Sequence, residues 1–558
     1  MQACHDRDDL REAYDRVLRL ASANFSSSGV FLERFVAHAR HVEVQVFGDG
    51  LGRTVSLGTR DCSLQRRNQK VVEEAPAPNL PDEIVEQMLA SSRTLASSVQ
   101  YRSAGTVEFV YDTSRGEVSF LEMNTRLQVE HPVTEEVTGV DLVEWMLRLA
   151  GGETTLLDAV PDSGPEITGH AVEARVYAED PCRDYRPSSG LLTHVEFPAH
   201  TRIETWVDTG TEISSFYDPM IAKVIVRGDS RRTAFAGLAE ALADTSVYGV
   251  QTNLSLLRTI CTEPPVLSAE HTTATLTGVT GTRRRIDVLR AGTMTTIQDF
   301  PGRTGLWEVG IPPSGPMDDL SLRAANLAVG NAEGTAGLEC TLQGPRLNFS
   351  DTTVVCVTGA PTAVTLDGEP VSMWDPIEVP AGGVLDVGTP TDVGLRTYVA
   401  VRGGLDVPLY HGSASTFTLG GFGGLTGAAV AIGDVLGLAD TTAVTDPASV
   451  PDDRRPEFGH TWHLAVTEGP QPAPAYFTPE DMAQFYDTTW TVQTHANRTG
   501  IRLDGPKPTW SRTDGATPDS TRRICTTIRT VSGHSMSRVI HRSCSVPTAR
   551  ASADSRAH

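Results

Sequence analysis

The sequence predicts a multidomain protein of the α+β class whose second half is rich in β-strands. Three observations support this prediction. The chain has 558 residues, which is enough for three to four domains. Helix-like and strand-like hydrophobic spacings both occur up to about residue 285. From about Ile286, short runs rich in Val, Thr and Leu are separated by Gly, Pro and Asp, which is typical of strands joined by turns.

Composition excludes several classes of function. The formal net charge is −23 and the isoelectric point is near 5.1, which argues against a nucleic-acid or anionic-membrane partner. The eight cysteines are scattered without a CxxC pair, and no stretch approaches 18 uninterrupted apolar residues. We therefore expect free thiols and a cytoplasmic location, with no membrane partner.

The first predicted elements are a helix and a charged segment. Leucines and Val17 recur at helical spacing within residues 1–21. Residues 60–78 then carry a basic cluster, which is followed by two glutamates: Arg66, Arg67, Lys70, Glu73 and Glu74. A solvated loop is an equally simple interpretation of this cluster.

A β-hairpin is predicted next. Residues 105–111 form a short apolar run with the lone carboxylate Glu108 at its centre, and burying such a group is costly unless it is paired or bound to metal. Residues 111–117 contain turn residues, so residues 118–124 form the second strand and place Glu122 beside Glu108. A divalent cation would remove the repulsion between these two carboxylates.

The most informative stretch is FLEMNTRLQVEHPVTE at residues 120–135. Every second residue is polar, so an extended chain places the following five side chains on one face: Glu122, Asn124, Arg126, Gln128 and Glu130. A solvated strand face gives the same alternation. Oxygen donors beside a guanidinium and a further carboxylate suit Mg²⁺, phosphate and a small anion held together.

Taken together, these runs resemble the biotin carboxylase family of ATP-grasp enzymes. The resemblance covers some 250 residues and includes VFLERF (30–35), ARHVEVQVFGDG (39–50), RSAGTVEFV (102–110), GHAVEARVYAEDP (169–181) and YDPMIAKVIV (217–226). It implies a partial ATP-grasp domain at 1–150 and a biotin carboxylase C-terminal domain at 165–278. The ATP-grasp phosphate lid and the domain that precedes it have no counterpart, so we expect a truncated chain that is inactive on its own.

The resemblance also implies roles for the matching residues. ATP would contact Glu33, His41, Gln65, Asn68, Glu108 and Glu122. Mg²⁺ or Mn²⁺ would be held by Glu108, Glu122 and Asn124. Bicarbonate would be bound by Lys70, Arg126, Gln128 and the backbone at Val129, with Glu130 as the base that deprotonates it. Arg175 would stabilise the enolate-like form of biotin as it takes up CO₂. Acyl-CoA-type carboxylases tend to have histidine where this chain has Asn68, which indicates a different branch.

The second half resembles a different family. Residues 295–331, 337–345, 357–370, 397–408 and 412–424 are similar to the carboxyltransferase half of urea carboxylases, a fold shared with allophanate hydrolase subunit 2. The resemblance implies a carboxyltransferase domain at 286–517. Individual roles stay open here. Asp318 and Asp319 either act chemically or cap a helix, and GGFGG (420–424) either approaches a ligand or forms tight turns. Arg498 either binds a carboxylate ligand or pairs with a surface acid.

The last segment, residues 518–558, lacks apolar periodicity. Residues 521–558 contain seven arginines and one aspartate, which is typical of a disordered basic tail. Synonymous codons can also be chosen so that another reading frame of Pro518–Ser555 spells a sequence like that of the carboxyltransferase family. We therefore expect this segment to be the disordered product of a one-nucleotide frameshift.

The two resemblances together imply ATP- and biotin-dependent carboxylation of urea to allophanate. Bicarbonate and urea would be substrates, and ATP, Mg²⁺ and biotin the cofactors. No biotin-attachment motif is present, so a biotinyl domain would be needed in trans or from an intact chain, and a homo-oligomer is possible. Two alternatives remain: a biotin carboxylase for another small amide or guanidine compound, and a non-functional frameshifted remnant.

Overall fold

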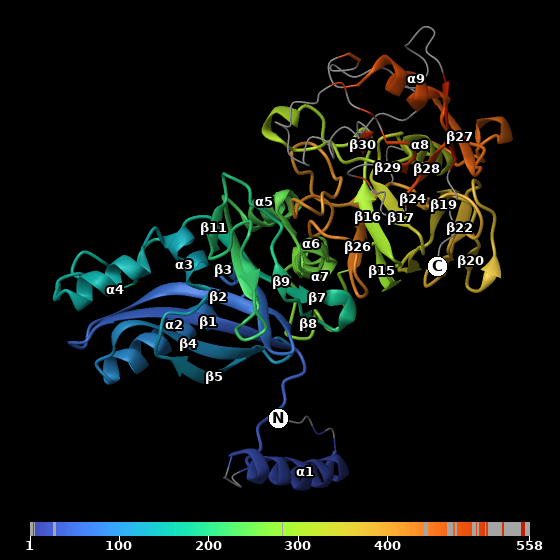
Figure 1. Ribbon diagram of the computed structural model, residues 1–558. Coiled ribbons are helices and arrows are strands. Elements are labelled where there is room, and N and C mark those ends of the chain that lie inside the picture. Colours follow the sequence, from blue (N-terminus) through green and yellow to red (C-terminus); the bar gives the residue numbers. More distant parts are fainter. Residues whose placement is uncertain are drawn as a thin grey trace.

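The computed structural model shows two bodies side by side and one separate helix (Figure 1). The structure describes residues 4, 6–25, 30–161, 163–281, 283–439, 445–465, 473–474, 477–493, 498, 501–507, 509, 511, 527–528 and 548–552. The first body mixes helices with a large sheet, and the second consists mainly of strands. The predicted α+β multidomain class is confirmed. Helix α1 (Arg7–Phe25), in the segment predicted to be helical, lies apart from both bodies.

An eight-stranded antiparallel sheet forms the centre of the first body, in the order β11-β13-β6-β3-β2-β1-β4-β5. Its strands are β1 (Ala39–Asp49), β2 (Thr54–Arg66), β3 (Gln69–Ala75), β4 (Arg102–Asp112), β5 (Glu117–Asn124), β6 (His170–Tyr177), β11 (Arg202–Thr205) and β13 (Met220–Gly228). The β3–β6 pairing joins residues on either side of the domain boundary predicted near residues 150–165. One sheet therefore runs through both predicted domains of the first half.

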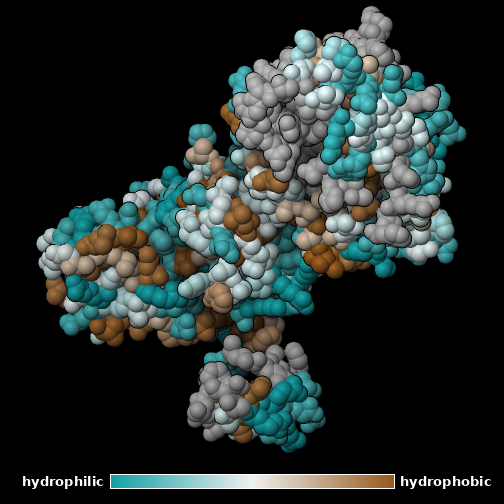
Figure 2. All heavy atoms as spheres, viewed as in Figure 1, coloured by the Kyte–Doolittle hydropathy of each residue, from teal (hydrophilic) through white to brown (hydrophobic). Residues whose placement is uncertain are grey.

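Helices cover this sheet and bury its apolar residues. They are α2 (Asp82–Ser98), α3 (His131–Thr138), α4 (Leu142–Ala150), α5 (Arg231–Asp244), α6 (Leu254–Ile260) and α7 (Pro264–Leu267). Helix α2 packs on β1 and β2 and contributes Met88 to a core shared with residues of β1 and β4, while α5 packs on β6 and β13 through Leu238. Helix α4 leaves Leu147 largely exposed, at an end of the body where Figure 2 shows hydrophobic atoms on the surface.

Short elements complete the first body. They are the strands β7 (Glu179–Asp180), β8 (Arg186–Pro187), β9 (Gly190–Leu191), β10 (His194–Glu196), β12 (Glu212–Ile213) and β14 (Ser246–Tyr248), and the 3₁₀ helix η1 (Pro181–Arg183). They pair as β7-β8, β9-β12 and β10-β14. The β10-β14 pair lies next to the second body, because Thr193 donates a hydrogen bond to Leu425 O at 3.0 Å.

Two sheets enclose the core of the second body. The seven-stranded sheet contains β15 (Arg285–Arg290), β18 (Arg346–Phe349), β20 (Val364–Leu366), β21 (Glu369–Pro370), β23 (Val384–Val387), β25 (Leu405–Asp406) and β26 (Val435–Leu438). The five-stranded sheet contains β16 (Met294–Gln298), β17 (Gly337–Thr341), β19 (Thr353–Gly359), β22 (Ile377–Val379) and β24 (Arg396–Val401). Both sheets bury Val, Leu and Ile side chains on their facing sides, as expected for a β-rich domain.

The remaining elements surround these sheets. They are α8 (Asp319–Ala328), α9 (Pro479–Asp487), η2 (Trp307–Val309), η3 (Asp452–Arg454), and the strands β27 (Thr461–Ala465), β28 (Trp490–Val492), β29 (Ile501–Asp504), β30 (Thr527–Ile528) and β31 (Thr548–Ser552). Of segment 518–558, the structure describes only β30 and β31, which pair with β29 and with β27 and β28. The rest of that segment lies outside the described residues, so its expected disorder stays a prediction. Among the described helices, none is long and apolar enough to cross a bilayer.

Candidate active site

The candidate site is a row of charged residues across four neighbouring strands. Glu43 on β1 lies opposite Arg60 on β2 and Glu108 on β4, and Glu108 lies opposite Glu122 on β5. The predicted hairpin, with Glu108 beside Glu122, is therefore present. Neighbouring strands are about 4.8 Å apart, so side chains in one row can share ligands.

Lys70 lies among three carboxylates, two of which belong to this row. Its Nζ is 2.6 Å from Glu130 Oε1 and 3.4 Å from Glu108 Oε1, and it forms an ion pair with Glu43. Burial alone would lower the pKa of Lys70, but the surrounding acidic groups outweigh this and raise it above its usual value. Lys70 is thus a permanent cation at the centre of an acidic cluster.

Glu130 is held by a second cation. Arg175 Nη2 on β6 donates a hydrogen bond to Glu130 Oε2 at 2.8 Å and lies 2.5 Å from Glu73 Oε1 on β3. Burial lowers the pKa of Arg175, but the charges of these two carboxylates outweigh this effect and raise the pKa above its usual value. Each oxygen of Glu130 therefore has a different cationic partner, Lys70 or Arg175.

The strand prediction for residues 120–130 is only partly correct. Strand β5 ends at Asn124, and Glu130 is the N-cap residue of α3, with Pro132 in the first helical turn. The chain therefore turns after Asn124, and the five polar residues do not share one extended face. Gln128 and Glu130 are buried, whereas Glu122 and Arg126 are exposed.

Glu108 has several partners at once. Its oxygens accept hydrogen bonds from Asn124 Nδ2 at 2.9 Å and Gln128 Nε2 at 2.8 Å, and Glu108 Oε2 lies 2.9 Å from His41 Nε2. Burial raises the pKa of Glu108. The hydrogen bond with His41 and the charge of Lys70 outweigh this and lower the pKa to about 2. Glu108 is therefore a carboxylate at any physiological pH.

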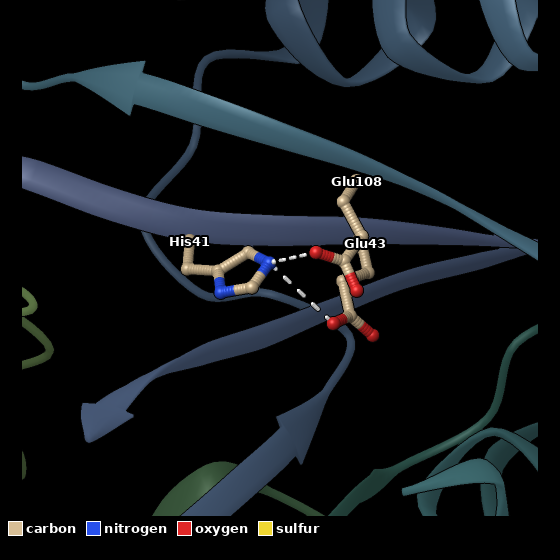
Figure 3. Close-up of side chains that lie close together, drawn as sticks. All are labelled: His41, Glu43 and Glu108. Atoms are coloured by element: carbon tan, nitrogen blue, oxygen red, sulfur yellow. Dashed lines mark hydrogen bonds and ion pairs between the residues drawn. The ribbon is translucent and has the colours of Figure 1, made fainter. Parts of the chain in front are cut away.

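Figure 3 shows that His41, Glu43 and Glu108 point toward one another from β1 and β4. His41 Nδ1 lies 2.7 Å from Gln65 Nε2, so two predicted nucleotide contacts touch directly. Burial lowers the pKa of His41, but its hydrogen bond to Glu108 and the charge of Glu43 outweigh this and raise it. When protonated, His41 would offset the negative charge of Glu43 and Glu108; when neutral, the same three side chains are close enough to share a metal ion.

The residues expected to hold Mg²⁺ fit that ion. Asn124 Nδ2 lies 2.9 Å from Glu108 Oε1 and 3.2 Å from Glu122 Oε1, so the three side chains converge. Rotation of the Asn124 amide by 180° would present its oxygen instead of its nitrogen. The set then offers only oxygen donors, which are the ligands that Mg²⁺ prefers.

Arg175 also has the free donor that a biotin ureido oxygen would need. Its Nε is buried and has no hydrogen-bond acceptor among the described residues. An unsatisfied buried donor is costly, and an added acceptor would remove that cost. The guanidinium therefore fits the role expected of it.

Some expected residues lie elsewhere. Glu33 is exposed in residues 30–36, whose neighbour Arg34 pairs with Glu117. Asn68 is exposed at the β2–β3 turn with φ of 65°. Arg126 donates to Leu127 O at 3.4 Å, and the carbonyl of Val129 accepts a 2.8 Å hydrogen bond from Lys223 Nζ.

Sequence reasoning did not identify Glu43 and Arg60 as site residues. Arg60 is fully buried and donates to Glu43 Oε2 at 3.0 Å, and also to Gln45, Thr106, Gln128 and Thr134. Glu43 is a lone carboxylate in an apolar strand, which is the same signal that identified Glu108. That signal could have found Glu43.

In the second body, Glu339 on β17 is the centre of a buried cluster. It pairs with Arg498 Nη2 at 2.5 Å and accepts hydrogen bonds from Met317 N at 2.7 Å and Tyr398 Oη at 3.0 Å. Arg498 therefore pairs with a buried acid and not with a surface one. Asp318 caps α8 by accepting from Ser321 N at 3.1 Å, as one of the two interpretations predicted.

Three families match successive parts of the chain. Residues 1–157 match the carbamoyl-phosphate synthase L chain, ATP binding domain, and residues 173–278 match the biotin carboxylase C-terminal domain. Residues 309–528 match the carboxyltransferase domain, subdomain A and B. The crystal structure of the Kluyveromyces lactis urea carboxylase superposes with a TM-score of 0.79 and 43% identity, over 91% of this chain and 44% of that one. The chain is homologous to the urea carboxylases.

Sequence relatives agree with this assignment. Urea amidolyase of Saccharomyces cerevisiae is 45% identical over 92% of this chain, and a putative urea carboxylase of Emericella nidulans is 41% identical over 92%. The alpha subunit of methylcrotonoyl-CoA carboxylase of Rattus norvegicus is 46% identical over 46% of the chain. The chain spans 28% of the Saccharomyces protein and 42% of the Emericella protein.

Proposed function

We propose that this chain provides the bicarbonate-activating and carboxyl-transferring parts of a biotin-dependent urea carboxylase, which converts urea to allophanate. The observation that supports this most directly is Glu130 between Lys70 and Arg175, at 2.6 Å and 2.8 Å. A carboxylate flanked by two cations suits a base that handles a small anion. ATP, Mg²⁺ and biotin are the cofactors typical of this family.

In the proposed first step, Glu130 takes the proton of bicarbonate. A bicarbonate oxygen then bonds to the γ-phosphorus of ATP, and the bond from that phosphorus to the bridging oxygen of ADP breaks. Lys70 offsets the negative charge of bicarbonate and of the transferring phosphoryl group. Glu108, Glu122 and Asn124 would hold the metal ion, whose charge lowers the barrier further.

Arg175 acts in the second step. Biotin, when bound, supplies the nitrogen that accepts the carboxyl group. Arg175 Nε would donate a hydrogen bond to the ureido oxygen as negative charge develops there. Glu73 Oε1 lies 2.5 Å from Nη2 of this guanidinium, the nitrogen that also contacts Glu130, and the two contacts fix its orientation.

The first test measures ADP release. The protein assayed is the longest natural polypeptide that contains this sequence, and it is supplied with MgATP, bicarbonate and a biotinylated carrier protein. We expect Glu130→Gln to reduce bicarbonate-dependent ADP release by roughly 10²-fold or more, because it removes the base. Glu144→Gln makes the same change on the exposed side of α4 and should retain the rate. ADP release that does not depend on bicarbonate, or that survives Glu130→Gln, would contradict the proposal.

Further parts of the proposal concern the substrate and the cell. Urea is proposed as carboxyl acceptor because the relatives named urea carboxylase match both bodies of this chain. A carboxylated product should form from urea, as allophanate, and not from guanidine or acetamide supplied at equal concentration. We further propose a biotinyl domain as partner, a homo-oligomer and a cytoplasmic location. Light scattering and cell fractionation would test the last two.

A further inference from the structure

A cavity of about 440 Å³ lies between the two bodies, away from the residues assigned above. Tyr248, Gln251, Ser255 and Arg258 line it from the first body, and Arg283 and Asp406 line it from the second. This volume is in the usual range for small-molecule sites. Hydroxyl groups line much of it: Ser246, Thr252, Ser255, Thr259 and Thr262.

The carboxylates at this cavity already have partners. Asp406 accepts a 2.8 Å hydrogen bond from Tyr248 Oη and forms an ion pair with Arg283. Asp180 Oδ1 accepts a hydrogen bond from Cys182 N at 2.9 Å, whereas its buried Oδ2 has no hydrogen-bond partner among the described residues and lies 3.7 Å from Arg183 Nε. The charge of Asp406 is therefore offset by direct contacts, and that of Asp180 only in part.

Arg258 differs, because no carboxylate among the described residues lies within ion-pair distance of it. Its guanidinium donates to Leu242 O at 2.8 Å and Thr245 O at 3.0 Å. Burial and the nearby charge of Arg283 lower the pKa of Arg258. Two guanidinium groups thus face a hydroxyl-rich cavity, and that of Arg258 has no ion-pair partner among the described residues, although the charge of Asp406 acts on it from a greater distance.

We propose that this cavity is a binding site for a phosphoryl group, held by Arg258 and Arg283 with hydroxyl groups from the first body. Guanidinium groups donate parallel hydrogen bonds that match phosphate oxygens. The hydroxyls of Ser255, Thr259 and Thr262 donate to backbone carbonyls, so the further donors come from Ser246 and Thr252. An apolar ligand would leave these polar groups unpaired, which disfavours it. The inference is independent of the carboxylation chemistry proposed above.

Occupancy of this site would stabilise the contact between the two bodies. The ligand would touch the first body through Arg258 and the second through Arg283, beside the hydrogen bond that joins Tyr248 to Asp406. A ligand that binds only the docked arrangement shifts the equilibrium toward it. The site would therefore couple phosphoryl-ligand concentration to the relative position of the two bodies.

Cys182 is a local reporter, because it lines the cavity and is partly exposed. The test measures its alkylation rate by peptide mass spectrometry in the full chain, with inorganic phosphate added at constant ionic strength. We expect the rate to fall by roughly tenfold when about nine-tenths of the sites are occupied. Cys4, also partly exposed and outside the cavity, should react at an unchanged rate. No change at Cys182 would overturn the proposal.

Two variants of one residue make the test specific. Gln251→Glu adds a negative charge to the cavity and should abolish protection of Cys182 by phosphate, whereas Gln251→Met should retain it. The backbone N–H of Gln251, which donates to Ser188 Oγ at 2.9 Å, is unaffected by either change. Arg258→Gln should also abolish protection, but it removes hydrogen bonds at the end of α5 as well. Equal protection in Gln251→Glu and Gln251→Met would overturn the proposal.

Further ligands distinguish the possible sources of the phosphoryl group. Protection by glucose 6-phosphate at lower concentration than inorganic phosphate would support the site and identify a phosphorylated metabolite as its occupant. Protection by inorganic phosphate alone would support it with free phosphate as occupant. Malonate, a dicarboxylate, should protect weakly. Malonate protecting as well as either phosphate compound would overturn the assignment to a phosphoryl group.

Discussion

At the scale of single residues, buried charges in the first body occur as partnered sets. Arg60 is fully buried with Glu43 at 3.0 Å, and Arg40 is buried with Asp61 at 2.6 Å. Removing one member of such a pair leaves an uncompensated charge, which costs more than the pair contributes. Arg60 is the extreme case, because its guanidinium donates to five side chains.

We therefore expect Arg60→Met to lower the free energy of unfolding by about 3–5 kcal/mol. Met fills much of the volume but leaves Glu43 without its strongest partner. Guanidinium chloride unfolding, followed by circular dichroism, measures the change. Arg115→Met removes an exposed arginine that is 3.9 Å from Asp112 and should change stability by about 1 kcal/mol or less. Similar losses in the two variants would contradict this expectation.

The sequence predicted those site residues whose signal is local. Alternation and the hairpin turn identified Glu108 and Glu122, because their pairing depends on residues close in the chain. Arg60 could not be found this way, since its partners come from β1, β4 and α3. Glu33 and Asn68 rested on resemblance alone, and the structure leaves both exposed. Their expected nucleotide contacts stay predictions.

At the scale of elements, β3 and β6 place two buried carboxylates directly opposite each other. Glu73 and Glu173 are both fully buried, and neither oxygen of Glu173 has a hydrogen-bond partner among the described residues. Burial, followed by the charge of Glu73, raises the pKa of Glu173 well above its usual value. Burial likewise raises the pKa of Glu73, to about 7.

These raised pKa values predict how stability depends on pH. The folded protein binds more protons than the unfolded chain above the ordinary glutamate pKa, so the free energy of unfolding falls as pH rises. Glu173→Gln removes this titration and should make stability less dependent on pH between about 5 and about 8. Chemical unfolding at about pH 5 and about pH 8 measures the free energy of unfolding of each variant. Glu212→Gln, at an exposed position, is the control. An unchanged slope in Glu173→Gln would show that the carboxylate does not hold its proton.

Within the GGFGG segment, Gly421, Gly423 and Gly424 have positive φ, as tight turns require. Gly423 has φ of 76°, and a Cβ there would lie 2.1 Å from Ser415 O. Gly412, which precedes the segment, has φ of 77°, but a Cβ there meets nothing within 4 Å. The φ angle is nearly the same at both positions, whereas the space beside each glycine differs.

We expect Gly412→Ala to cost about 1 kcal/mol from the left-handed backbone alone. Gly423→Ala has the same backbone cost and adds a clash with a backbone carbonyl. It should therefore lower the midpoint of thermal unfolding more than Gly412→Ala does. Calorimetry of both variants isolates the steric contribution, because the conformational one is shared. Equal losses would mean that the turn shifts to make room.

At the scale of the whole molecule, the first body is held together by its continuous sheet. The resemblance to biotin carboxylases implied two domains, divided near residues 150–165, and the sequence motifs contain no information on the β3–β6 pairing that connects them. That pairing joins Val72 to Ala174 across about a hundred residues. The fold class was predictable, since it depends on local patterns, and the division at about residue 285 stays a prediction from the same patterns.

This continuity predicts that residues 39–278 unfold together. Leu238→Ala on α5 creates a cavity in the core that also contains Leu64, Val72 and Val224, at a cost of about 2–5 kcal/mol. We expect hydrogen exchange to accelerate in β2, β3 and β13 alike, but not in β19 and β24. Leu385→Ala in the core of the second body should give the opposite pattern. Acceleration in β13 alone would show that the two predicted domains unfold independently.

The row formed by Arg60, Glu43, Glu108 and Glu122 has a consequence for misfolded copies of the protein. Each member comes from a different strand, so the row exists only when three strand pairings are in register. A slip of one residue in β1 would replace Glu43 by Val42 or Val44 and turn the acid to the opposite face. A copy with such a slip would not assemble the row at all, so it would lack the site on which the proposed function depends. Under that proposal, ATP would be consumed only by copies whose sheet is paired correctly.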